Sequence, residues 1–118
     1  MQKRKVKEKP LYYVFKDLDK KGGRKDVLQR KIKSLALDHF KQNAKLLSKV
    51  FITNEDQEHA LKFVVILKND DLKSAKIVFR FLGDYYCFDL SNRYPVYFDL
   101  IPKSLESKLD CKELIIEN

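Results

Sequence analysis

Apolar side chains recur at helical spacing over residues 26–50, the longest such pattern in the chain. At about 100° per residue, one side of this stretch is apolar and another carries lysine and arginine, which predicts one long amphipathic helix. Asp26 is positioned to cap its N-terminus, just after Gly22 and Gly23 break the preceding pattern. The β-branched and aromatic residues that end the stretch predict that the helix passes into a strand near Lys49.

On either side of that helix the pattern is typical of strands. Residues 11–15 form a short run rich in aromatic side chains, which predicts an N-terminal strand. After the helix, alternation and short apolar runs between polar turns predict strands over residues 50–53, 61–68, 76–82, 85–90 and 96–101. The 61–68 strand is apolar on both faces in its middle, which predicts a central position in the sheet. Gly83 and Asp84 predict a tight hairpin connection.

The C-terminal stretch, residues 103–116, supports two interpretations. Ser104 as N-cap, with residues at helical spacing behind it, favours a short helix. The alternative is a helix that ends near Cys111 and is followed by a short strand over residues 114–116. With the short helix, the predicted fold is α+β: an N-terminal strand, one long amphipathic helix packed on a curved four- to five-stranded antiparallel meander, and a short C-terminal helix. This element order resembles that of cystatin-like and nuclear-transport-factor-like rolls, which implies no function.

Length and composition predict one domain, since 44% of the 118 residues are hydrophobic and suffice for a single core. Residues 1–10 are basic and almost without apolar side chains, so we expect a flexible arm before a single α+β domain over residues 11–118. The apolar runs are too short for a membrane span and no signal-peptide core is found, which predicts a cytoplasmic protein. Two cysteines supply neither a disulfide framework nor a zinc site, so no metal or cofactor is expected.

Positive charge is concentrated in the first half of the chain. Residues 1–50 carry 16 Lys and Arg against 5 Asp and Glu, whereas residues 51–118 carry 9 against 12. One basic face on an otherwise neutral domain is typical of a surface that binds nucleic-acid phosphates, although most charge runs are only solvated surface. The residues predicted to form this surface are Lys3, Arg4, Lys5, Arg24, Lys25, Arg30, Lys41, Lys45 and Lys49.

Candidate catalytic groups are few. His39 falls on the apolar side of the predicted helix, where a histidine is typically a core residue hydrogen-bonded through one ring nitrogen. On the predicted last hairpin, Asp89 and Asp99 could approach each other beside Arg80 and Tyr85. An exposed sheet face with Arg80 as counter-ion is the simpler interpretation. The chain is therefore expected to be a binding module rather than an enzyme.

One short run resembles a known family. Residues 78–86, Val-Phe-Arg-Phe-Leu-Gly-Asp-Tyr-Tyr, are similar to the strand-Gly-Asp-Tyr-strand hairpin of small basic bacterial toxins that act as ribosome-dependent ribonucleases. The resemblance covers under a tenth of the chain, and the family usually has Arg where Tyr86 stands. It implies an enzyme in which Arg80, Tyr85 and Tyr86, with basic helix residues, stabilise the developing phosphate charge.

Three functions are therefore considered. The first is a small basic cytosolic module that binds nucleic acid through its Lys- and Arg-rich N-terminal half. The second is a protein-interaction or assembly module that self-associates as a homo-oligomer through a sheet face, because one helix can cover only one face of a sheet with a two-sided apolar strand. The 14 aromatic residues of the chain also motivate this second function. The third is the ribonuclease-like toxin.

Overall fold

The computed structural model describes residues 10–53, 60–69, 71–104 and 112–117. The predicted flexible arm lies outside these residues except for Pro10, and the single-domain organisation stays a prediction. The described elements are α1 (Leu11–Lys21), α2 (Lys25–Gln42), the 3-10 turn η1 (Ala44–Leu46), β1 (Leu47–Thr53), β2 (Leu61–Leu67), α3 (Leu72–Tyr85), α4 (Leu90–Arg93), β3 (Val96–Leu100) and β4 (Lys112–Glu117).

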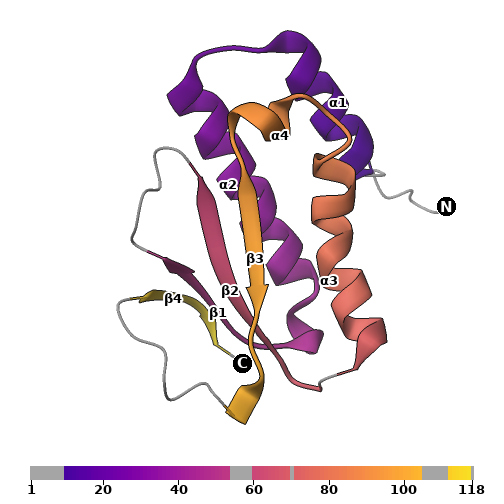
Figure 1. Cartoon of the computed structure of the whole chain (residues 1–118), viewed down its shortest axis with the longest axis vertical. Helices are drawn as coiled ribbons and strands as arrows, with labels where there is room; N and C mark the ends of the chain where they lie inside the picture. The colour runs from indigo at the N-terminus through magenta and orange to yellow at the C-terminus, as the bar shows by residue number, and fades with distance from the viewer. Residues whose placement is uncertain (1–9, 54–59, 70, 105–111, 118) are drawn as a thin grey trace, which may run out of the picture.

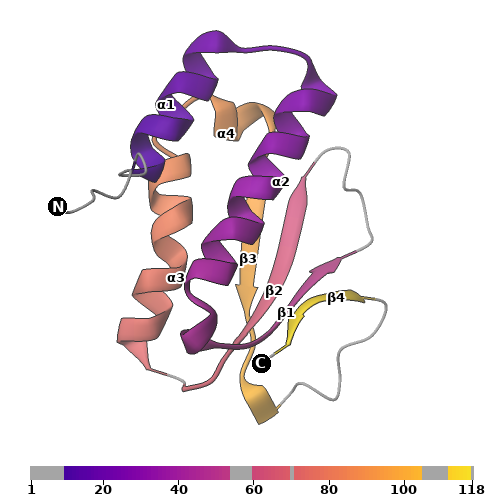
Figure 2. The ribbon, with the colours of Figure 1, turned by 180° about the vertical axis from the view of Figure 1, so that it is seen from behind.

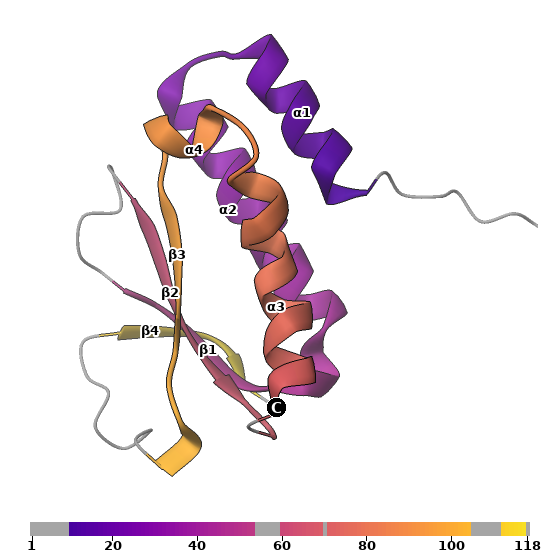
Figure 3. The ribbon, with the colours of Figure 1, turned by 45° about the vertical axis from the view of Figure 1, so that its right-hand side comes forward.

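The fold is α+β with two layers (Figure 1). The four strands form one layer, and α1, α2 and α3 lie together on one side of it, as Figure 3 shows. Seen from behind, in Figure 2, α2 crosses in front of the sheet and α3 runs beside it. Two long helices, rather than the one predicted, therefore cover the same side of the sheet.

The sheet is mixed, with strand order β3-β2-β1-β4. β1 pairs antiparallel with both β2 and β4, whereas β2 and β3 are parallel, with Phe63 opposite Phe98. β2 has neighbours on both sides, which confirms its predicted central position. β3 and β4 follow each other in the sequence but lie at opposite edges. The predicted four- to five-stranded antiparallel meander is therefore wrong.

Residues 11–15 begin helix α1 and do not form the predicted N-terminal strand. Leu11, Phe15 and Leu18 are spaced for one side of a helix, and Phe15 is fully buried. Its ring lies 5.1 and 5.0 Å from two aromatic rings of α3. Gly22 ends the helix with φ 65°, and its N–H donates to the Leu18 carbonyl at 3.0 Å. Packing of one helical face therefore overrides the β propensity of the aromatic run.

Helix α3 replaces the predicted strand over residues 76–82. The predicted strand over residues 85–90 does not form either, since Tyr85 ends α3 and Leu90 begins α4. Asp71 caps it, because the carboxylate accepts a hydrogen bond from the Ser74 N–H at 2.6 Å. The buried residues recur every three or four positions, at Ser74, Val78, Phe81 and Tyr85. The hairpin that carried the resemblance to ribonuclease toxins does not form, since its residues lie in this helix and its cap.

Helix α2 ends at Gln42, well before the predicted end near Lys49. The helix ends here because the Asn43 side-chain amide donates a hydrogen bond to the His39 carbonyl at 2.9 Å and so satisfies a backbone acceptor of the last turn. The predicted passage from helix to strand is confirmed, but it occurs earlier and gives the longer strand β1.

The end of the chain forms strand β4, which pairs with β1. The predicted short C-terminal helix is therefore wrong over residues 112–116, and the alternative strand over residues 114–116 is confirmed. Residues 105–111 lie outside the described part of the chain.

The core lies between the helices and the sheet and is strongly aromatic. Neighbouring ring centroids are 4.9–6.4 Å apart in a cluster of Phe15, Phe40, Phe63, Phe81, Tyr85 and Phe98. All six side chains are buried and come from both layers. A large part of the aromatic content is therefore explained by the core.

The second face of β2 is also covered within the single chain. Val64 and Ile66 point away from the helix-facing core residues Phe63 and Val65, and their exposed fractions are 2% and 0%. The uncovered apolar face that motivated self-association is therefore not found.

Candidate nucleic-acid interface

The turn between α1 and α2 is densely basic. Gly22 and Gly23 have φ values of 65° and 131°, which L side chains rarely adopt, so glycine suits both positions of this connection. Four exposed cations surround these glycines within six residues: Lys20, Lys21, Arg24 and Lys25. Figure 1 shows this turn at the upper end of the molecule, beyond α4.

The flanking turns of both helices extend this charge. Residues 16–31 hold seven Lys and Arg against three Asp. We call the exposed cations of this segment the basic hairpin: Lys16, Lys20, Lys21, Arg24, Lys25, Arg30 and Lys31. They project from α1, from the start of α2 and from the three-residue connection between them, and this connection lies at one end of the molecule (Figure 1).

Asp19 and Asp26 of this segment bind other residues of the protein. Asp19 accepts a hydrogen bond from the Leu90 N–H at 2.9 Å and lies 3.9 Å from the Arg93 guanidinium of α4. Asp26 binds Arg24 at 2.9 Å and lies 3.9 Å from Arg30. The hydrogen bond from Arg24 lowers the pKa of Asp26. Arg24 is thus partly neutralised by Asp26.

The three lysines nearest the turn carry the free charge. Within the described ranges, no ion pair is found for Lys20, Lys21 or Lys25. A phosphate could therefore approach these lysines without first displacing a carboxylate.

The fold divides the interface predicted from the sequence. Arg24, Lys25 and Arg30 lie together at the start of α2. Lys41 is exposed on the last turn of the same helix, about 16 Å further along the axis than Arg30. The predicted arm residues Lys3, Arg4 and Lys5 lie outside the described part of the chain.

The other two predicted residues do not belong to the helix. Lys45 lies in η1 and Lys49 in β1, so the long basic stripe expected on one helix does not exist beyond Lys41.

Lys16, Lys20 and Lys21 were not among the residues predicted from the sequence. Because a strand was predicted over residues 11–15, the residues that follow were interpreted as a connection, although they complete α1. The available signal was the dense run of cations on both sides of Gly22 and Gly23, between two helical patterns.

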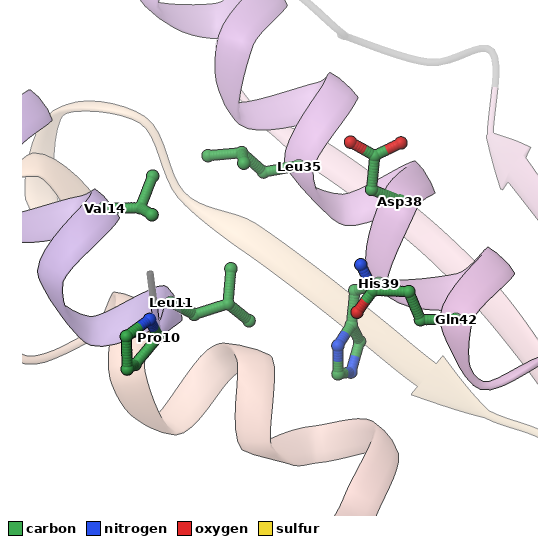
Figure 4. A pocket seen from close by; sticks show the side chains of 7 residues that line it. All are labelled: Pro10, Leu11, Val14, Leu35, Asp38, His39 and Gln42. Carbon is green, nitrogen blue, oxygen red and sulfur yellow. The ribbon is translucent and has the colours of Figure 1, made fainter. Parts of the chain in front are cut away.

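A separate cavity of about 580 Å³ opens between the start of α1 and the second half of α2. Leu11 and Val14 face Leu35 across it, with the exposed Asp38 at the margin (Figure 4). Pro10, His39 and Gln42 complete the lining. The size suits a small molecule, but a mostly apolar wall with one carboxylate does not identify a ligand class.

His39 is confirmed as a core residue. Its exposed fraction is 8%, and its Nε2 donates to the Val78 carbonyl at 3.0 Å. The Asn43 amide lies 3.5 Å from Nδ1, so that nitrogen acts as the acceptor. Burial lowers the pKa of His39, against the opposing effect of the hydrogen bond to Val78. The neutral ring thus links α2 to α3.

The residues considered for catalysis are not brought together. The hydroxyl of buried Tyr85 donates to the Tyr94 carbonyl at 2.5 Å, and Asp89 lies 3.8 Å from Arg93. Arg80 is exposed on α3, whereas Asp99 is exposed on β3. In the part of the chain that the structure describes, no three His, Cys, Asp or Glu side chains are arranged to hold a metal ion.

Comparisons with protein-family models, curated proteins and solved structures gave no match to this chain. Across the described helices, none has the length and apolar character needed to cross a bilayer. The basic hairpin is therefore the feature of the described residues that bears most directly on function.

Proposed function

We propose that the chain is a non-catalytic cytosolic module that binds nucleic acid through the basic hairpin. The observation that carries this proposal is the concentration of seven exposed cations on two consecutive helices and the short connection between them. A phosphate backbone binds such a surface because each contact releases condensed counterions. The contacts are made to phosphates, so binding has little dependence on base sequence.

An exposed aromatic side chain favours a single-stranded ligand. Tyr13 is 51% exposed on α1 and precedes Lys16 and Lys20 at helical spacing, so the three side chains share one side of the helix. An unstacked base can stack on such a ring while its phosphates meet the lysines. In duplex DNA the bases are not available for this contact.

The proposal is tested by replacing Lys20 and Lys21 together with Glu. Binding of a fluorescent 20-nucleotide single strand is measured by anisotropy between 50 and 200 mM salt. We expect weaker binding, and a log-log salt slope reduced by about 1.4 if both lysines contact phosphates. Absence of wild-type binding at 50 mM salt to single-stranded DNA, single-stranded RNA and duplex DNA would contradict the proposal.

Matched controls make the same change of net charge elsewhere. Lys73 and Lys76 are exposed on α3, outside the basic hairpin, and their double replacement with Glu should keep the wild-type salt slope. Replacement of Lys41 and Lys45 with Glu should have a smaller effect than the Lys20 and Lys21 pair. An equal loss in all three variants would mean that only total charge matters.

The other two functions have less support. Self-association through a sheet face was motivated by an uncovered apolar strand, and Val64 and Ile66 are covered. The ribonuclease hypothesis depended on a hairpin at residues 78–86, where the chain is helical up to its cap at Tyr86.

A further inference from the structure

Strand β3 lies at one edge of the sheet, and its hydrogen bonds show which of its residues face outward. The Leu61 N–H donates to the Pro95 carbonyl at 3.0 Å, at the start of the pairing with β2. The Ile101 N–H donates to the Val65 carbonyl at 3.0 Å, at its end. In a parallel ladder, alternate residues direct both backbone groups to the same neighbour.

This alternation turns the backbone groups of Tyr97 and Asp99 toward β2. Those of Val96, Phe98 and Leu100 point away from the sheet. The edge of β3 therefore presents three outward N–H and C=O pairs.

A tyrosine hydroxyl satisfies the first of these pairs. The Tyr86 hydroxyl donates to the Val96 carbonyl at 2.6 Å and accepts from the Val96 N–H at 3.0 Å. These are the two atoms that a neighbouring strand would bind. Among the described residues, the outward groups of Phe98 and Leu100 have no such partner. The edge is thus closed at its first position and open at the next two.

A groove runs beside the closed position, Val96, and the first open position, Phe98. Its volume is about 530 Å³, and Leu82 of α3 and Tyr86, the residue that caps this helix, line it opposite β3. Three of the exposed large hydrophobic side chains gather at this edge, with exposed fractions of 45%, 47% and 41% for Tyr86, Tyr97 and Leu100. Figure 1 shows α3 and β3 running beside each other here.

We propose that this edge accepts an extended peptide of a partner protein as an additional antiparallel strand. The peptide alternates apolar, basic and apolar side chains. Its apolar residues pair with Phe98 and Leu100, and the one opposite Phe98 enters the groove beside Leu82. Its basic residue lies opposite Asp99, on the other face of the sheet.

The charge of Asp99 selects the basic residue. This carboxylate is exposed, and the described residues supply it with no ion pair. A residue opposite Asp99 forms a non-hydrogen-bonded pair, in which the side chains are closest. Opposite charges in such cross-strand pairs are favourable and like charges are unfavourable.

A second copy of the chain fits this edge less well. The symmetric antiparallel register that uses both open positions pairs Phe98 with Leu100 of the other copy. It also places Asp99 opposite the same residue of the other copy. Two like charges then face each other at the centre of the interface.

The test uses two fluorescent octapeptides with central Val-Lys-Val or Val-Glu-Val and the full chain. We expect the lysine peptide to bind about tenfold more tightly at 100 mM salt. This preference opposes the net charge of +8, which would attract the glutamate peptide. The Asp99→Lys variant should reverse it. Equal binding of the two peptides, or no wild-type binding, would overturn the proposal, as would an unchanged preference in Asp99→Lys.

Two further measurements test the geometry. Leu100→Pro removes an outward N–H without removing a bond to β2, so it should abolish binding of both peptides while circular dichroism stays unchanged. Methylation of the two valine nitrogens of the lysine peptide should abolish binding in the same way. Retained binding in the methylated peptide would overturn strand addition. A dimer seen by sedimentation equilibrium, and lost in Leu100→Pro, would assign the edge to a second copy instead.

Discussion

His39 and Tyr85 place polar groups inside an aromatic core. Each donates a hydrogen bond to a backbone carbonyl, His39 to Val78 at 3.0 Å and Tyr85 to Tyr94 at 2.5 Å. An unpaired buried donor costs about 1–3 kcal/mol, so these bonds allow both rings to pack among phenylalanines. Burial also raises the pKa of Tyr85. Both groups are held in their neutral forms for a structural reason.

The neutral state of His39 predicts how stability depends on pH. Burial lowers the folded-state pKa from 6.5, so the unfolded chain binds this proton more strongly. The contribution of His39 to the free energy of unfolding should be fully present above about pH 7 and should decrease as the pH falls through 6.5. Titration of this single group cannot change the free energy of unfolding by more than about 1.4 kcal/mol per pH unit, the limit for one proton. Urea unfolding between pH 7.5 and 5.5 measures it.

The matched variants are His39→Gln and His59→Gln, which remove the two histidines of the chain one at a time. Gln at position 39 cannot titrate, so the variant should show a nearly flat pH profile. His59→Gln should keep the wild-type profile. A wild-type slope in His39→Gln would mean that another group is responsible.

Helix α3 is the element that most changes the expected architecture. It begins after its cap, Asp71, buries one side, and continues as a regular helix through Gly83. A Cβ added at Gly83 meets no atom within 4 Å, and the residue lacks a positive φ. The hairpin interpretation, in contrast, required this glycine in a tight turn.

The two interpretations predict opposite effects of Gly83→Ala. In the helix, alanine should raise the free energy of unfolding by about 0.5–1 kcal/mol, because the unfolded chain loses less freedom on folding. Gly22→Ala is the control, since φ of 65° strains a side chain there and should lower stability by about 1 kcal/mol. Urea titrations of both variants measure the signs. Destabilisation by Gly83→Ala would contradict a helical residue 83.

The elements that the sequence predicted are those with local signals. A long amphipathic pattern gave α2, and the two-sided apolar run gave the central strand β2. Helix α3 was predicted wrongly as strand because Ile77, Phe79 and Phe81 alternate over a short window. The helical spacing becomes clear only when the window is extended to Tyr85. The predicted nucleic-acid site was partly wrong because the helix was predicted to continue past Asn43, which placed Lys45 and Lys49 on it.

At the scale of the whole molecule, the sheet order depends on contacts that no local pattern encodes. The strands β2 and β3 are parallel because α3 carries the chain back across the helical side of the sheet. The residues between β3 and β4 then connect opposite edges. Three of the six strands predicted from the sequence do not form, and the pairing of the others depends on which faces pack together, which no local pattern encodes.

The same arrangement separates two surfaces. The basic hairpin lies at one end of the helical layer, whereas the open positions of β3 lie at the sheet edge beside α3. A nucleic acid and a peptide would therefore contact different elements. Charge reversal at Lys20 and Lys21 should leave binding of the Val-Lys-Val peptide within about twofold of wild type, since the two surfaces share no residue. Anisotropy with the labelled peptide measures this independence, and a large loss would mean that the surfaces are coupled.

The most direct test of nucleic-acid binding is an amide chemical-shift map of the isotope-labelled chain during titration with an unlabelled 20-nucleotide single strand at 50 mM salt. We expect the largest shifts within residues 13–31, on α1, the glycine connection and the start of α2, and we expect them to diminish as salt is raised to 200 mM. Largest shifts on α3 or β3, or no shifts at 50 mM salt, would contradict the proposed nucleic-acid binding.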